Sequence, residues 1–328
     1  MKKRQLTLLT LLVVAAAMTV GCGSNSVPTF NQLAFISSRT VTPTTPLFVM
    51  KLDGSSLTPV ASSSSSVWTP SNSADLKTVV FTSGGNVWSS NASGSTQTQL
   101  TTFDNQSTWA FETRISPDGK QIAYTIYDNS VGNDTVWIMK ADGSAAVNLN
   151  ATLPTGTNGC YSASFSADSS KVVYACYSNS SSYTYGLYVA KTDGTSVTSV
   201  TGQQSYFMDT PAFSPDGKQI YFVQSSGCCA AKQAVPGLNR THTPRSHAAP
   251  PSIGTSGITS VNLDGSNATV VVPGSSLRDV EILNSTLYYT FDDTNLNLWQ
   301  IHKSNLDGTG DVSISDGTAN DYLGVSTD

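Results

Sequence analysis

Three aspartates hold equivalent places in a repeated sequence pattern, and they are the strongest candidates for chemistry in this chain. Counting back from the serine of a recurring Ser-Pro-Asp-Gly motif, or from its nearest equivalent, puts Asp209, Asp279 and Asp321 at one offset. If the repeats surround an axis, these carboxylates would form a ring that could coordinate Ca²⁺ or Mg²⁺ or share one proton. Alternatively, each aspartate accepts hydrogen bonds from loop N–H groups within its own repeat.

Other polar and aromatic residues fall beside these aspartates in the same alignment. Tyr161 occupies the aspartate offset in another repeat, and Glu112 and Tyr322 follow one residue later in theirs. Aromatic rings in this region could stack on a sugar or a peptide. The predicted ligand-binding residues are Asp209, Asp279, Asp321, Glu112, Tyr161 and Tyr322.

The sequence lacks the familiar catalytic motifs. It contains no Gly-x-Ser-x-Gly elbow, no His-Glu-x-x-His pair and no phosphate-binding loop. With only three histidines in the chain, a Ser-His-Asp arrangement is not expected. We therefore predict no catalytic residue, and we expect no cofactor unless a divalent cation such as Ca²⁺ binds the aspartates.

Two hairpin patterns alternate along the chain and would position these residues. "ISPDGKQIAYT" (115–125) returns as "FSPDGKQIYFV" (213–223), with a weaker copy "FSADSSKVVYA" (165–175) between them. Pro, Asp and Gly favour a tight turn, and the alternating residues that follow favour a strand. The second pattern is a strand followed by Asp-Gly, as in "VWIMKADG" and "LYVAKTDG", and it occurs six times with variations.

Self-similarity every 40 to 50 residues, with four short strands per period, is typical of a β-propeller. The six copies predict an all-β fold with six four-stranded antiparallel blades. The segment "FNQLAFIS" (30–37) resembles a second strand, and "NDYLGVSTD" (320–328) resembles an innermost first strand. We therefore expect the N- and C-terminal strands to pair and close the ring, which removes exposed sheet edges. The alternative is an open β-solenoid or sandwich.

The repeats "SPDGKQIAY" and "SPDGKQIYF", together with the "MKADG", "AKTDG" and "NLDG" turns, resemble the TolB-type (WD40-like) propeller repeat. The resemblance covers nearly all of residues 30–328 and implies the propeller fold. It says less about function because the matching residues build turns. The chain leaves no room for the separate α/β domain of TolB, so we do not carry over the partners of TolB.

The N-terminus is typical of a secreted protein. Lys2, Lys3 and Arg4 precede an apolar run that ends at "TVGC", which resembles a bacterial lipobox with Cys22 as the lipidated residue. We predict a signal peptide at 1–21, a lipid-anchored tether at 22–29 and the propeller at 30–328. The expected location is the cell envelope, on the outer membrane facing the periplasm. An ordinary cleaved signal and an uncleaved anchor are the alternatives.

The charge balance argues against nucleic acid as a partner. The chain has 17 Lys+Arg and 22 Asp+Glu, and removal of residues 1–21 leaves 14 basic residues and a net charge of −8. No basic cluster remains to neutralise phosphates. We expect a monomer that contacts the membrane only through its lipid anchor.

Cysteine placement fits an oxidising compartment. Cys160 begins one predicted strand and Cys176 ends the next, so the two residues fall opposite each other across a hairpin. Opposed residues on antiparallel strands are close enough for a disulfide. We predict a Cys160–Cys176 disulfide, with two buried free thiols as the alternative.

One long insertion, 227–257, interrupts the repeat. It contains Cys228, Cys229, His242 and His247, which suggests a metal site. Adjacent cysteines chelate poorly, and the simpler interpretation is a Pro- and Ala-rich surface loop.

These observations favour a non-enzymatic binding module that takes an envelope protein, glycan or peptide at one mouth of the propeller channel. The rival hypothesis is a lyase or hydrolase of glycans or peptides that uses the aspartate ring with a divalent metal. A third is a propeller that once regulated access to a peptidase domain.

Overall fold

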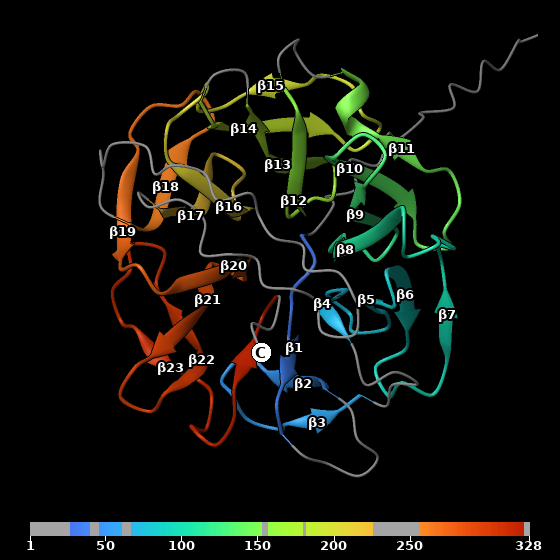
Figure 1. Cartoon of the computed structure of the whole chain (residues 1–328). Coiled ribbons are helices and arrows are strands. Elements are labelled where there is room, and N and C mark those ends of the chain that lie inside the picture. The colour runs from blue at the N-terminus through green and yellow to red at the C-terminus, as the bar shows by residue number, and fades with distance from the viewer. Residues whose placement is uncertain are drawn as a thin grey trace, which may run out of the picture.

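The chain folds as a six-bladed β-propeller (Figure 1). The computed structural model describes residues 27–39, 46–60, 67–152, 157–179, 182–225 and 256–324. Within these residues there are six antiparallel sheets of four strands each, arranged around a central channel. The predicted fold class and the predicted number of blades are confirmed.

Each blade is named here by its order along the chain, and its strands run from the channel to the rim. Blade 1 contains β24 (Asp321–Tyr322), β1 (Gln32–Ser37), β2 (Leu47–Lys51) and β3 (Thr58–Pro59). Blade 2 contains β4 (Trp68–Asn72), β5 (Val79–Ser83), β6 (Asn86–Ser90) and β7 (Gln97–Gln99). Blade 3 contains β8 (Thr108–Ile115), β9 (Gln121–Asp128), β10 (Asn133–Lys140) and β11 (Val147–Asn148), followed by the short 3₁₀ helix η1 (Leu149–Thr152).

The remaining blades follow the same plan. Blade 4 contains β12 (Gly159–Phe165), β13 (Lys171–Ser178), β14 (Thr184–Lys191) and β15 (Thr198–Ser199). Blade 5 contains β16 (Phe207–Phe213), β17 (Gln219–Ser225), β18 (Gly257–Asn262) and β19 (Thr269–Pro273). Blade 6 contains β20 (Leu277–Leu283), β21 (Thr286–Asp293), β22 (Leu298–Ser304) and β23 (Val312–Ser313).

The hydrophobic core lies between neighbouring blades. In the second strand of blade 4, "KVVYACYS", the five residues from Val172 to Cys176 are buried, because both faces of this sheet pack against a neighbour. Tyr174 packs against blade 3 with Val136 and Ile138, whereas Val173 packs against blade 5 with Phe222. A four-stranded sheet cannot bury both of its faces alone, so the closed ring is the unit that is stable.

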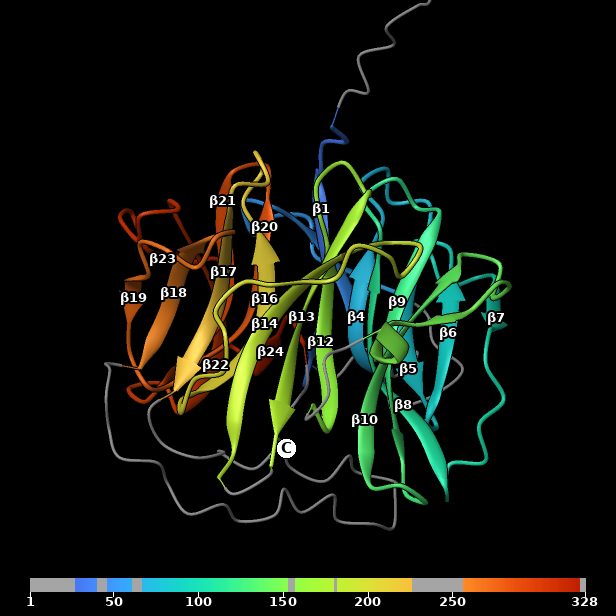
Figure 2. The same ribbon diagram turned by 90° about the horizontal axis from the view of Figure 1, so that it is seen from above.

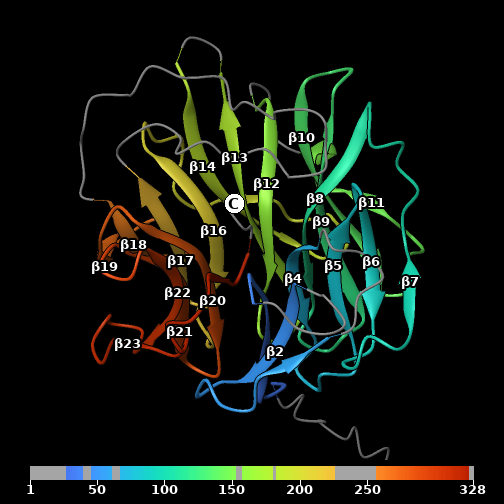
Figure 3. The same ribbon diagram turned by 60° about the horizontal axis from the view of Figure 1, so that its bottom comes forward.

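The two ends of the described chain close this ring. β24 pairs antiparallel with β1, with Ile36 opposite Tyr322 and Ser37 opposite Asp321. Figure 3 shows β24 in red beside the channel, next to the blue strands of blade 1. The predicted pairing of terminal strands is therefore confirmed, and the open solenoid and the sandwich are wrong.

The Asp-Gly turns have a second role that only the packed ring shows. A Cβ atom built on Gly308 would overlap the carbonyl oxygen of Val271, in the outermost strand of the preceding blade. A Cβ atom on Gly265 would likewise overlap the carbonyl oxygen of Val200, and one on Gly54 would overlap that of Ile314. In each case the carbonyl belongs to the preceding blade. These glycines have φ between 81° and 90°. They are therefore needed both for the turn and for a close contact between blades.

Several predictions concern residues outside the described ranges. These are the signal peptide, lipidation at Cys22, and the insertion with its suggested metal ligands Cys228, Cys229, His242 and His247. All of them stay predictions. Within the part of the chain that the structure describes, no helix has the length and apolarity needed to cross a bilayer.

Candidate functional site

The innermost strands are irregular where they face the channel. A bulge shifts the register of β4, β8, β12, β16 and β20. At four of these bulges one residue adopts a left-handed conformation, with φ between 44° and 53°: Thr69, Ser162, Thr210 and Asp279. A left-handed conformation is costly for a residue with a side chain, and such strain gathers at functional sites. The bulges direct these short polar residues to one level of the channel.

The register of the inner strands corrects the alignment that put three aspartates at one offset. Asp209 pairs with Val223 of the second strand, and the equivalent pair in blade 6 is Arg278 with Thr290. Asp279 is therefore the counterpart of Thr210, one step deeper in the channel. The turn after β20 is shorter than the Ser-Pro-Asp-Gly turn. The sequence alignment, which counted back from that turn, was therefore wrong by one residue in blade 6.

Asp321 lies at a third level. It pairs with Ser37, and Tyr322 takes the position that Asp209 takes in blade 5. The three carboxylates therefore do not form one ring. Among the described residues, no group of three or more His, Cys, Asp and Glu side chains is placed to hold a metal ion.

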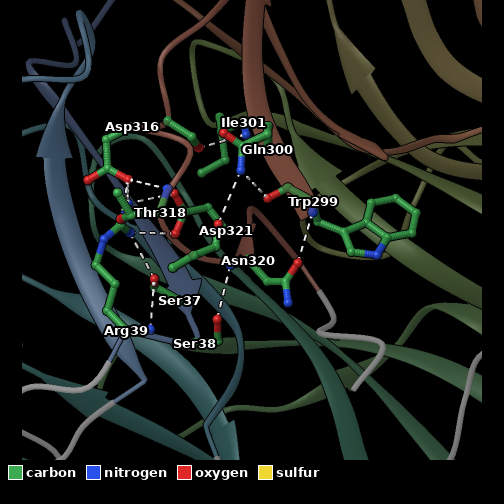
Figure 4. A network of polar contacts seen from close by, with 12 residues as sticks. Ser37, Ser38, Arg39, Trp299, Gln300, Ile301, Asp316, Thr318, Asn320 and Asp321 are labelled. Carbon is green, nitrogen blue, oxygen red and sulfur yellow. Dashed lines mark hydrogen bonds and ion pairs between the residues drawn. The ribbon is translucent and has the colours of Figure 1, made fainter. Parts of the chain in front are cut away.

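Asp321 instead belongs to the contact that closes the ring (Figure 4). Its carboxylate accepts hydrogen bonds from Arg39, with Nη1 at 2.5 Å and Nη2 at 3.1 Å. Arg39 Nη2 also lies 2.6 Å from Asp316 Oδ1. Burial raises the pKa of Asp321, while Arg39 opposes that rise by stabilising the carboxylate. This role is close to the structural alternative considered for the aspartates.

Glu112 and Asp209 do come together, through a serine that lies between them. Ser162 donates its backbone N–H to Glu112 Oε2 at 2.7 Å and its hydroxyl contacts Glu112 Oε1 at 3.0 Å. The same hydroxyl contacts Asp209 Oδ1. Blades 3, 4 and 5 are therefore linked at the channel by two carboxylates and one serine.

Asp279 is the most unusual group in the channel. Its side chain is buried, with the residue 7% exposed, and Oδ2 has no hydrogen-bond partner among the described residues. Burial raises its pKa, Asp209 adds to the rise, and Arg114 and Arg278 oppose it. Asp279 lines a narrow cavity of about 30 Å³, here called the waist, together with Glu112, Arg114, Ser162 and Thr210.

A larger cavity lies at the end of the channel where the inner strands finish, here called the exit mouth. Its volume is about 120 Å³. Its wall includes apolar side chains from four blades and from the N-terminal segment: Ile115, Phe165, Phe213, Ile282, Leu283 and Phe30. Arg114 and Glu281 also line it, with Arg114 Nη2 3.5 Å from Glu281 Oε1. Burial raises the pKa of Glu281 to about 7, despite the opposing charge of Arg114.

The N-terminal segment is held at the exit mouth by one side chain. Phe30 donates its backbone N–H to Asn284 Oδ1 at 2.9 Å, and Asn284 Nδ2 donates to the Phe30 carbonyl at 2.5 Å. Figure 2 shows the blue N-terminal segment leaving the propeller at this side, beside β1. Residues 27–30, the first that the structure describes, therefore lie at the exit mouth.

Aromatic side chains surround the opposite end, where the inner strands begin, here called the entrance mouth. Tyr161 stacks on Phe207 with ring centroids 6.1 Å apart, and Tyr185 meets Phe207 edge-on at 5.3 Å. On the other side, Trp299 lies 5.9 Å from Tyr322, and the Arg278 guanidinium lies 4.6 Å from the Trp299 ring centre. The predicted Tyr161 and Tyr322 are themselves buried, at 5% and 1% exposed, and pack behind Phe207 and Trp299 on facing sides of the entrance mouth.

Several residues of the channel were not predicted from the sequence. They are Arg39, Arg114, Ser162, Arg278 and Glu281. Arg114 and Glu281 hold equivalent places, each one residue before the isoleucine that pairs with the start of the second strand, so the repeat alignment could have found them. Ser162 and Arg278 become visible only when the bulges are known.

Cys160 and Cys176 are joined by a disulfide across the first hairpin of blade 4. Both residues are fully buried in the core between blades 3 and 4. The disulfide therefore ties an inner strand to its neighbour just below the entrance mouth.

Comparison with solved structures identifies the fold class. TolB from Acinetobacter baumannii superimposes with a TM-score of 0.63 at 17% identity, over 89% of this chain and 65% of that one. A putative TolB from Agrobacterium tumefaciens gives 0.55 at 16% identity, over 89% and 97%. A nidogen/laminin complex gives 0.60 at 13% identity, over 89% and 96%.

At these identities the likeness concerns the fold alone. This chain is a TolB-like six-bladed β-propeller, and it spans about two thirds of the length of the Acinetobacter protein. No protein-family profile matches the chain, and no curated protein sequence matches it.

Proposed function

We propose that this chain is a binding module of the bacterial cell envelope that takes a protein, peptide or glycan ligand at the entrance mouth. The observation that carries the proposal is one part-exposed aromatic ring on each facing side of that mouth: Phe207, backed by the buried Tyr161, and Trp299, backed by the buried Tyr322. Further along the channel, Glu112, Ser162 and Asp209 supply hydrogen-bonding side chains at the border with the waist. Aromatic faces with nearby polar groups suit sugar rings and peptide side chains.

The envelope location rests on the sequence. A signal peptide at 1–21, followed by a lipidated Cys22, would place the mature chain outside the cytoplasm on a lipid anchor. The TolB-like fold and the disulfide agree with such a compartment. Because the chain leaves the propeller at the exit mouth, an anchor at Cys22 would keep the entrance mouth pointing away from the membrane.

The nidogen/laminin complex supports protein as a ligand class, since it is a propeller of this fold in a complex with another protein. The test is capture from an envelope extract by the mature chain, followed by identification of what is retained. Phe207→Ala and Arg278→Ala, which remove one group on each side of the entrance mouth, should abolish capture. Lys77→Ala, an exposed residue of a distant turn, is the control. Equal capture by all variants would overturn the proposal.

The second candidate is a propeller enzyme for glycans or peptides that uses a divalent cation. The convergence of Glu112 and Asp209 on Ser162 favours it, because two carboxylates and a hydroxyl are ligands that Ca²⁺ accepts. Calcium and manganese titrations with wild type and Glu112→Gln test this candidate. Binding that depends on Glu112, together with turnover of an oligosaccharide or peptide panel, would favour the enzyme over the binding module.

A further inference from the structure

The waist and the exit mouth adjoin each other in the channel. Arg114, Ser164 and Val280 line both cavities. A molecule in the exit mouth would therefore lie beside the waist without contacting the aromatic groups at the entrance mouth. Glu112 and Ser162 border both the waist and the ligand site proposed above, but the other residues of the two sites differ.

The waist has an unmet need for a hydrogen-bond donor. Asp279 Oδ2 is buried and has no hydrogen-bond partner within the part of the chain that the structure describes, although its carboxylate lines the cavity. A buried carboxylate oxygen without a donor costs free energy that a bound donor would return. Asp279 also holds a left-handed conformation at φ 53°, and this strain directs its side chain into the channel.

The charges around the waist favour a cation over a neutral donor. Glu112 and Asp279 line the waist and Glu281 lines the adjoining exit mouth, so three acidic side chains border the two cavities. Two arginines oppose them: Arg114 is paired with Glu281, and Arg278 lies over the Trp299 ring. The acidic groups therefore exceed the basic ones, and a positively charged ligand group would reduce this imbalance.

The exit mouth has the opposite character. Ile115, Phe165, Phe213 and Ile282 present apolar surface from four neighbouring blades, and Phe30 adds more from the N-terminal segment. Its volume of about 120 Å³ is comparable with the roughly 150 Å³ of an apolar protein cavity that admits benzene. The space thus has one apolar end and one acidic end.

We propose that the exit mouth and waist together bind a primary ammonium group carried on an apolar body. The ammonium donates to Asp279 Oδ2, and the apolar body packs against Phe213 and Ile282. Such a group is found both in free aralkyl amines and at the N-terminus of a peptide that begins with an apolar residue. The site does not depend on the ligand of the entrance mouth.

The first experiment uses calorimetry on the mature chain with three probes that share one ring. 2-Phenylethylamine should bind, whereas 2-phenylethanol and 3-phenylpropionate should not, because only the amine offers a cation to Asp279. Equal binding of the alcohol would overturn the proposal, and so would preferred binding of the acid. This comparison needs no variant, so a folding defect cannot obscure it.

Variants then locate the site. Asp279→Asn should weaken amine binding by at least about tenfold, because a charged hydrogen bond is lost. Asp193→Asn, the same change in an exposed turn, should leave it unchanged. Ile282→Ala should weaken binding without altering the preference for the amine. A thermal melt of each variant verifies folding, and unchanged affinity in a folded Asp279→Asn protein would refute the assignment.

Two further arms separate the sources of the ammonium. If Phe-Gly-Gly binds and N-acetyl-Phe-Gly-Gly does not, the ligand can be a peptide N-terminus. Binding of 2-phenylethylamine alone would identify a small amine; either result supports the proposal. If Ca²⁺ or K⁺ alone binds with the same dependence on Asp279 and no amine competes, the waist is an inorganic cation site and the proposal is wrong.

Discussion

Arg39 and Asp321, which are 282 residues apart in sequence, form a bidentate ion pair that fastens the first blade to the C-terminal strand (Figure 4). Asp321 is 1% exposed, so its carboxylate depends on this partner. Only two residues of β24 pair with β1, which makes the backbone contribution to closure small. The ion pair therefore supplements a short β-ladder at the one place where the ring is not covalently continuous.

Replacement of Arg39 by Gln should lower the free energy of unfolding by about 3 to 5 kcal/mol, because it leaves a buried carboxylate without its counter-charge. Urea denaturation measures the change. Lys218→Ala, which removes an exposed pair with Asp216, should cost less than about 1 kcal/mol. A loss at Arg39 as small as that at Lys218 would show that the pair does not hold the ring closed.

Loss of the disulfide should destabilise blade 4. Cys160 and Cys176 are 16 residues apart, and closing a loop of this size contributes about 3 kcal/mol in the chain-entropy model. Unfolding in urea with and without reductant should show a loss of this order. The Cys160→Ala/Cys176→Ala variant should no longer respond to reductant, which separates this bond from any effect at Cys228 or Cys229. Free thiols at both positions in non-reducing peptide mapping would contradict the prediction.

Replacement by alanine should cost more stability at one positive-φ glycine than at another. Gly308→Ala should destabilise the protein by about 2 kcal/mol or more, because the new methyl group overlaps the Val271 carbonyl in addition to the φ strain. Gly84 also has positive φ, but no atom lies within 4 Å of the built Cβ. Gly84→Ala should therefore cost only about 1 kcal/mol. Equal losses in urea denaturation would mean that the turn alone requires the glycine.

The stability contributed by Glu281 should fall as pH rises. Its pKa is raised from 4.5 to about 7 in the folded protein, so the protonated form is favoured by folding. The contribution is fully present below pH 4.5 and is lost as pH rises through 7. Glu281→Gln mimics the protonated form and should match wild type at pH 4.5. At pH 8 it should be more stable by up to about 3 kcal/mol, as measured by urea unfolding across this range.

The groups that face Glu281 define the control for that experiment. Arg114 lies beside it and Asp279 raises its pKa from the same strand. Glu112→Gln changes another channel carboxylate that accepts three hydrogen bonds, from Thr125 and Ser162. It should therefore lose stability rather than gain it at pH 8. A gain in both variants would indicate general repulsion in the channel instead of the titration of Glu281.

Local sequence determined most of the fold. The turn residues of "SPDGK" and "KADG" set where each hairpin turns, and the β-formers between them set the strands, because these preferences act over a few residues. Six copies of the second pattern specified six blades. The half-repeats at 30–37 and 320–328 specified closure, since each lacks the neighbouring strand that the other supplies.

Tertiary structure decided the site, for a physical reason that the repeat conceals. Five of the six inner strands contain a bulge, and the turn after β20 is shorter, so a one-residue error in alignment moves a side chain to another level of the channel. Asp209, Asp279 and Asp321 are alike in sequence but meet Ser162, an empty donor position and Arg39, respectively. Those partners come from different blades, and only the packing of the whole ring brings them within reach.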